Sequence, residues 1–225
     1  MIEEKINSSC IMLAVDLDMP ISLGAIFKPR DLVNSSIELD SHITLLYTTG
    51  ILNKDSVIPD IKRVFANSSL SKNIKDGFDF FKFLESQKEL NPKPVFDLFD
   101  LSYFERDNSD FVVLRLREDT GIFTILNTLN AGLTKAYNVK SEFSKYRPHV
   151  TLAEVKSGLG KEYSENESLE LALENSKIRF EDIIFSYGIE NNGKTEYKQW
   201  DLTNFYSVDR FFRKEKLRNF LRELE

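Results

Sequence analysis

The chain has only two histidines, and both begin the same four-residue pattern. His42 opens the segment His-Ile-Thr-Leu, and His149 opens the segment His-Val-Thr-Leu. Alternation of polar and apolar residues is typical of a half-buried β-strand, in which side chains two positions apart share a face. Each histidine is therefore expected to share a face with its threonine, while the apolar neighbours point into a core. The pattern predicts two such strands, each carrying an acid/base group beside a hydroxyl group.

The composition fits one domain with a packed core and excludes some classes of partner. The 225 residues are 41% hydrophobic and include 18 Phe and 8 Tyr, which suffices for a core of ordinary size. The net charge is −6 and the isoelectric point is near 5.2, so we expect no broad binding of duplex nucleic acid. A small basic pocket for a single phosphate group remains compatible with this charge.

Cysteine content and the N-terminal sequence indicate a protein of the cytoplasm. The single Cys10 cannot form an internal disulfide, and no Cys/His cluster suggests a zinc site. We therefore expect neither a metal nor another cofactor. The N-terminal segment Met-Ile-Glu-Glu lacks a signal-peptide pattern, and no apolar run approaches the length of a membrane span. We expect no membrane partner.

Hydrophobic periodicity predicts a mixture of strands and helices. The expected strands are 10–17, 42–47, 95–104, 111–117, 147–155, 178–187 and 195–202. The expected helices are 56–65, 120–137 and 167–174. A polar connector spans 18–41, and Asn192-Gly193 between two strand-like segments indicates a hairpin.

Two segments stand apart from this pattern. We expect a main domain over residues 1–207, with an irregular insertion at about 68–94 that packs on it. Residues 208–225 are expected to form an amphipathic helix with a basic face. A terminal helix packed on the domain is the favoured interpretation of this tail, and docking of a partner is the alternative.

Two histidines that face one cleft suit an in-line displacement at phosphorus. A histidine titrates near neutral pH, so one ring can take a proton from the attacking group while the other gives a proton to the departing oxygen. The hydroxyl groups of Thr44 and Thr151 can donate hydrogen bonds to the phosphoryl oxygens, whose charge grows in the transition state. Which histidine is the acid and which the base stays open, because their local sequences are nearly identical.

The paired motifs resemble the two signature motifs of the 2H phosphoesterase superfamily, and Pro148 before the second motif fits that pattern. This superfamily includes cyclic phosphodiesterases of the LigT type and phage or viral enzymes that destroy nucleotide signals. The resemblance covers about residues 10–202. It implies a bilobal α/β (α+β) fold in which two antiparallel sheets flank a central groove, with helices outside. It also implies that His42, Thr44, His149 and Thr151 form the catalytic set.

Four further residues are candidates for substrate binding. Arg147 shares the face of His149 if the strand already runs there, and could neutralise a phosphate, although a solvated arginine is an equal alternative. Lys28 and Arg30 lie in the connector before the first motif, where surface charge is the favoured interpretation. Tyr146 could stack on a base, and so could Tyr47, but strand alternation directs Tyr47 to the core, so packing is favoured.

We therefore expect a metal-independent phosphodiesterase that cleaves a nucleotide or short RNA at a 2′,3′-cyclic, 2′–5′ or cyclic oligonucleotide linkage. A composition rich in Lys, Asn, Phe and Ile slightly favours a phage or viral enzyme that degrades a nucleotide immune signal. Cyclic phosphodiesterase activity in RNA repair or tRNA processing is the main rival. A nucleotide-binding sponge without turnover and a scaffold that recruits a partner through its tail are alternatives outside catalysis.

Overall fold

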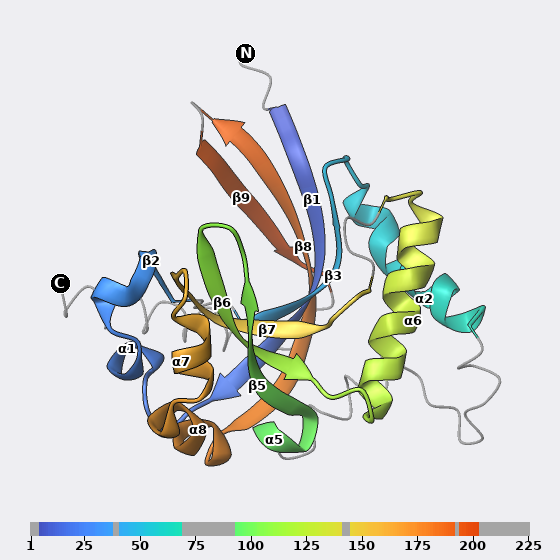
Figure 1. Ribbon diagram of the computed structural model, residues 1–225. Coiled ribbons are helices and arrows are strands. Elements are labelled where there is room, and N and C mark those ends of the chain that lie inside the picture. The colour runs from blue at the N-terminus through green and yellow to red at the C-terminus, as the bar shows by residue number, and fades with distance from the viewer. Residues whose placement is uncertain (1–4, 38–40, 69–92, 141–144, 192–193, 203–225) are drawn as a thin grey trace.

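The computed structural model describes residues 5–37, 41–68, 93–140, 145–191 and 194–202 (Figure 1). The predicted C-terminal helix, 208–225, lies outside the described residues, as does almost all of the predicted insertion at 68–94.

Strands hold more of the described residues than helices do. They are β1 (Lys5–Asp18), β2 (Leu32–Ile37), β3 (His42–Thr48), β4 (Lys93–Pro94), β5 (Phe99–Glu105), β6 (Ser109–Leu116), β7 (His149–Lys156), β8 (Lys177–Asn191) and β9 (Lys194–Asp201). The α-helices are α1 (Leu23–Ile26), α2 (Val57–Ala66), α5 (Val95–Leu98), α6 (Gly121–Ala136), α7 (Gly160–Ser164) and α8 (Glu167–Glu174). Two 3₁₀ turns, η1 (Pro29–Asp31) and η2 (Lys54–Ser56), precede β2 and α2.

The described strands form one antiparallel sheet with the order β4-β8-β1-β3-β7-β6-β5. In addition, β9 pairs with β8 and β2 pairs with β7. The two halves of this sheet meet where Ile43 of β3 pairs with Val150 of β7. Figure 1 shows the sheet strongly curved, with α2 and α6 outside one part of it and α7 and α8 outside another. The predicted α+β class is confirmed, and the two predicted sheets are the halves of one continuous strand order.

Helix α6 shows how the sequence fixes an element that covers the sheet. Thr120 caps its first turn, because the Thr120 hydroxyl accepts a hydrogen bond from the Phe123 backbone N–H at 3.3 Å. Apolar residues at helical spacing bury one face of the helix against the core. They are Ile122, Ile125, Leu126, Leu129 and Leu133. The helix predicted at 120–137 is confirmed, and so are the helix at 167–174 and the hairpin, in which Asn191 pairs with Lys194.

Two predicted segments differ from the structure. The strand expected from Val95 begins only at Phe99, because 95–98 form the short helix α5. Val95 is fully buried and its N–H donates to the Ser176 carbonyl, so tertiary contacts override its preference for a strand. The connector at 18–41 contains α1, η1 and β2, which lack the apolar alternation that would have indicated them.

The prediction that Tyr47 faces the core is wrong. Along β3, Met12 pairs with Thr44 whereas Ile11 pairs with Leu46, so Leu45 is an extra residue in the ladder. Such a bulge reverses the alternation of side chains beyond it. Leu45 and Leu46 are both buried, and Tyr47 is 50% exposed.

Candidate active site

The pairing of β3 with β7 brings the two His-x-Thr motifs together. Ile43 and Val150 are opposite each other, and both are fully buried. Continuing this antiparallel register by one residue in each direction places His42 opposite Thr151 and Thr44 opposite His149. The side chains of all four residues leave the face opposite to Ile43 and Val150, and all four are partly exposed. The site therefore has approximate twofold symmetry, with each histidine beside the other motif's threonine.

The register also sets the separation of the two rings. Residues directly opposite on antiparallel strands have Cβ atoms about 5 Å apart, and diagonal neighbours lie about 7–8 Å apart. His42 and His149 are diagonal neighbours, which leaves room for a phosphoryl group between their rings. Their closeness has an electrostatic consequence, because a positive charge on His42 lowers the pKa of His149.

His149 is held in one orientation by its surroundings. Its Nδ1 lies 2.7 Å from the Arg147 carbonyl oxygen, which accepts a hydrogen bond from the Nδ1–H group and leaves Nε2 as the basic atom of the neutral ring. The Phe104 ring meets the imidazole edge to face, with centroids 4.9 Å apart. Burial lowers the pKa of His149, the bond to the Arg147 carbonyl opposes this, and the charges of His42 and Arg106 lower the pKa further. The lowered pKa favours the neutral form of the ring.

Thr44 is tied to the first strand and to the segment before β7. Its hydroxyl hydrogen-bonds to the Cys10 thiol, whose pKa is raised to about 12, chiefly by burial. The backbone carbonyl of Thr44 accepts a hydrogen bond from the Tyr146 hydroxyl at 2.7 Å. Tyr146 packs against the core, and burial raises the pKa of its phenol. Tyr146, a predicted base-stacking residue, thus lies at the site and links the two motifs.

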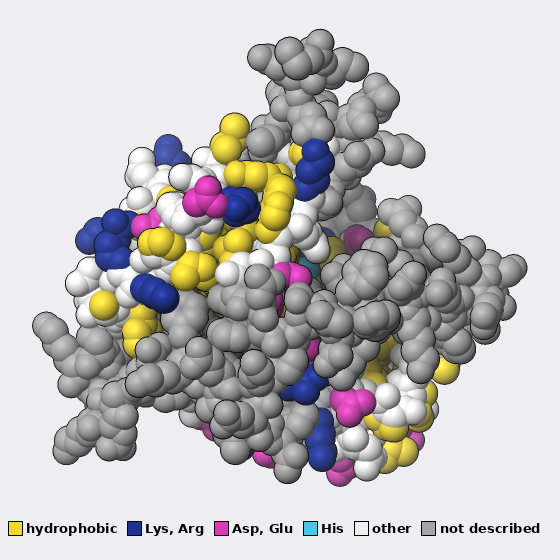
Figure 2. Space-filling view, turned by 180° about the vertical axis from the view of Figure 1, so that it is seen from behind, with side chains coloured by type: hydrophobic (Ala, Val, Ile, Leu, Met, Phe, Trp, Pro, Cys, Tyr) yellow, Lys and Arg dark blue, Asp and Glu magenta, His cyan; other side chains and the backbone are white. Residues whose placement is uncertain are grey.

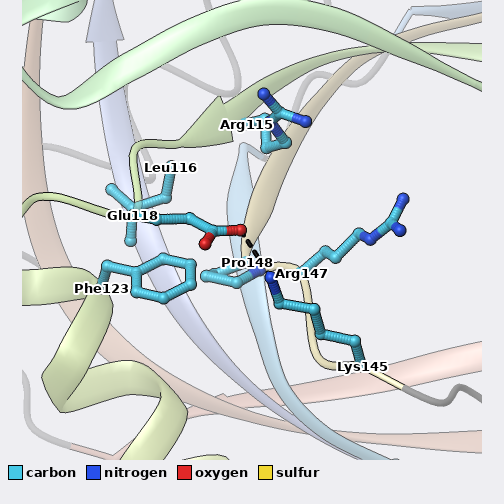
Figure 3. A pocket seen from close by; sticks show the side chains of 7 residues that line it. All are labelled: Arg115, Leu116, Glu118, Phe123, Lys145, Arg147 and Pro148. Atoms are coloured by element: carbon cyan, nitrogen blue, oxygen red, sulfur yellow. Dashed lines mark hydrogen bonds and ion pairs between the residues drawn. The ribbon is translucent and has the colours of Figure 1, made fainter.

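Arg147 lies at the edge of a pocket beside His149. We call this the basic pocket; it is lined by Arg115, Leu116, Glu118, Phe123, Lys145, Arg147 and Pro148 (Figure 3). Arg115 is the cross-strand partner of His149 on β6. Lys145 pairs with Glu118 at 2.7 Å, and both side chains are more than half exposed. Arg147 precedes the first residue of β7, so strand alternation alone does not fix its direction.

Lys28 and Arg30 are not brought to the histidines. Leu32, just after them, pairs with Val155 on β7, six residues along that strand from His149. At about 3.3 Å per residue this is about 20 Å. The Lys28 backbone N–H donates to the Tyr163 hydroxyl, and Arg30 lies 3.7 Å from Asp31. Their predicted contact with substrate therefore requires a ligand that extends far along β7.

Sequence reasoning missed several residues around His149. Phe104 lies in β5, Arg106 in the turn after it and Arg115 in β6. Their alternation could be read from the sequence, but no local signal reveals that β6 lies next to the second motif. Figure 2 shows a small patch of histidine side chain deep near the centre of the face seen from behind.

Among the described residues, no group of three or more His, Cys, Asp or Glu side chains could hold a metal ion. No described helix is long and apolar enough to cross a membrane.

The structure is similar to solved structures of phosphoesterases, whereas no protein-family model and no curated protein matches the chain. The apo form of E. coli LigT has 14% sequence identity and a TM-score of 0.36, covering 88% of this chain and 99% of that chain. E. coli LigT complexed with 3′-AMP has 13% identity and a TM-score of 0.34, covering 85% and 99%. A crystal structure of a phosphoesterase has 14% identity and a TM-score of 0.35, covering 85% and 99%. The predicted resemblance to LigT-type proteins is confirmed as a resemblance, and at this similarity it says nothing about activity or substrate.

Proposed function

We propose that the chain is a phosphodiesterase that cleaves a nucleotide phosphodiester without a metal, with His42 and His149 as acid and base. The observation that carries this proposal is the Ile43–Val150 pairing, because it sets both motifs side by side on one face of the sheet. Two histidines with unrelated structural roles would not be expected to lie as neighbours on one face of the sheet.

The arrangement supplies the groups that an in-line displacement needs. One ring removes a proton from the attacking hydroxyl or water, and the other protonates the departing oxygen. Thr44 and Thr151 flank the phosphoryl group from neighbouring strands, so their hydroxyls can donate to its non-bridging oxygens. Such donors stabilise the transition state selectively, since charge accumulates on those oxygens during the reaction.

The surroundings of His149 favour the role of base. Its Nδ1 donates to the Arg147 carbonyl, and its lowered pKa favours the form in which Nε2 is unprotonated. His42 is then the acid that protonates the departing oxygen. With water as the nucleophile a cyclic phosphate is opened, whereas a neighbouring 2′-hydroxyl as the nucleophile leaves a cyclic phosphate.

For the substrate we propose a 2′,3′-cyclic, 2′–5′ or cyclic oligonucleotide linkage. The favoured setting is a phage or viral enzyme that removes a nucleotide immune signal, and an enzyme of RNA repair or tRNA processing is the rival. A sponge that binds such a nucleotide without turnover would keep the threonine donors but would not need two histidines.

Turnover of a nucleotide panel in EDTA tests this proposal. The panel holds a 2′,3′-cyclic mononucleotide, a 2′–5′ dinucleotide and several cyclic di- and trinucleotides, with products separated by chromatography. Wild type should cleave at least one member, and His42→Ala and His149→Ala should each lower turnover by about two to four orders of magnitude. Lys161→Ala, an exposed substitution in α7, is the control and should leave turnover unchanged. Binding without cleavage would favour the sponge, and near-wild-type turnover in either histidine variant would remove that residue from the mechanism.

A further inference from the structure

The basic pocket gathers positive charge in a chain whose net charge is negative. It is lined by Arg115, Lys145 and Arg147, and by one acidic residue, Glu118. Glu118 is paired with Lys145, and Lys145, Arg115 and Arg147 all lower the pKa of the Glu118 carboxyl, with Lys145 having the largest effect. Their three positive charges therefore converge on one small region.

Arg147 is the cation best placed to receive a ligand. Within the part of the chain that the structure describes, its guanidinium has no ion pair, and its side chain is exposed. Figure 3 shows the Lys145 amino group directed at Glu118 and the Arg147 guanidinium extending away from that ion pair. Among the described residues, Arg115 forms one loose ion pair, with Asp100 at 3.8 Å. Two arginine forks are thus available, and such forks bind phosphate oxygens in pairs.

The pocket lies immediately beside the catalytic pair. Arg115 is directly opposite His149 across the β6/β7 ladder, so both side chains leave the same face. The carbonyl of Arg147 holds the His149 ring while the Arg147 side chain lines the pocket. A nucleotide whose reacting phosphate lies between the histidines can therefore place its next phosphate in the pocket.

We propose that the basic pocket binds a second, non-reacting phosphate of the substrate. This inference rests on the proposed function in that it takes the reacting phosphate to lie between the histidines. It narrows the substrate class to nucleotides with more than one phosphate, such as a 5′-phosphorylated cyclic nucleotide or a linear or cyclic oligonucleotide. Phe123 and Pro148 give the pocket an apolar wall that fits the sugar next to such a phosphate.

Binding of paired product-like ligands tests the inference without depending on turnover. Affinities are measured calorimetrically for adenosine 2′-monophosphate and for the 2′,5′- and 3′,5′-bisphosphates of adenosine. Wild type should bind at least one bisphosphate about tenfold more tightly than the monophosphate, since each charge-assisted contact adds to affinity. The ratio of the bisphosphate affinity to the monophosphate affinity should fall to near one in Arg147→Ala. Arg147→Lys should retain part of the preference. Replacing the Arg147 side chain leaves its backbone carbonyl in place to hold the His149 ring. The variant therefore tests the pocket without removing the hydrogen bond to His149.

Matched controls and a competitor make the outcome decisive. Lys145→Ala should reduce the preference, whereas Lys161→Ala, which removes another exposed lysine from a pair with a glutamate, should not. Inorganic phosphate should weaken binding of the bisphosphate more than that of the monophosphate. Equal affinities for all three nucleotides, absence of binding, or a preference that survives Arg147→Ala would overturn the inference. If the protein cleaves a substrate but does not prefer a bisphosphate, the phosphodiesterase proposal stands and the pocket proposal fails. If it prefers a bisphosphate but cleaves nothing, the pocket proposal stands and the phosphodiesterase proposal fails.

Discussion

At the scale of single residues, the surroundings of His149 give it properties that its motif alone does not specify. His149 is held by the Arg147 carbonyl, contacts Phe104 and lies near Arg106. These neighbours come from the second half of the sheet. The local sequences of the two motifs are nearly the same, so these properties of His149 arise from the residues that pack around it.

The pH dependence of the reaction should reveal the base. Burial above all, and then the charges of His42 and Arg106, lower the pKa of His149. A base acts in its neutral form, so a lowered pKa keeps it active to more acidic pH. We expect the acidic limb of the kcat/KM profile to lie below about 6.5, the ordinary histidine value. Arg106→Ala should move that limb towards higher pH, whereas Lys161→Ala should not; a limb at or above the ordinary value would contradict the assignment of His149 as base.

At the scale of elements, the packing of α6 against α2 supports the face of the sheet opposite to the site. Asn130 of α6 donates to the Leu45 carbonyl at the bulge of β3, which ties this helix to the first motif strand. Gly132 of α6 lies directly against Val64 of α2, so a methyl group at position 132 would overlap the valine side chain. Close approach of the two helices therefore requires glycine at this position.

Gly132→Ala should lower the free energy of unfolding by about 1–3 kcal/mol, because overpacking forces the helices apart. Gly121→Ala is a matched control at the start of the same helix, where a methyl group would contact nothing within 4 Å. That change should be neutral or stabilising by up to about 1 kcal/mol, since alanine favours a helix over glycine. Denaturant unfolding measures both variants, and equal stabilities would show that α2 and α6 separate without cost.

At the scale of the whole molecule, the proposed active site lies where the two halves of the sheet meet. The first half contributes β3 and the second contributes β7, and these strands pair at Ile43 and Val150. Neither half contains both histidines. An intact fold is therefore needed to form the acid/base pair.

In the proposed mechanism this pair and the two threonines supply proton transfer and charge stabilisation, so turnover should not depend on a divalent ion. Wild-type activity should be the same after extensive dialysis against EDTA as in buffer with added Mg²⁺ or Mn²⁺. Product formation is followed for the panel member that is cleaved best. Loss of activity in EDTA that one divalent ion restores would overturn the metal-free mechanism.

The sequence by itself determined most of the strands, the major helices and the four motif residues, because these depend on local alternation, helical spacing and capping. The predicted class of fold followed from the resemblance carried by the two motifs. Only the tertiary structure decided the register of β3 against β7, the bulge that exposes Tyr47, the short helix at Val95 and the position of Arg115 beside His149. These features depend on pairing between residues far apart in the chain, and local periodicity carries no information about which strands become neighbours. For the same reason the basic pocket, built from β6, α6 and the segment before β7, could not be found from the sequence.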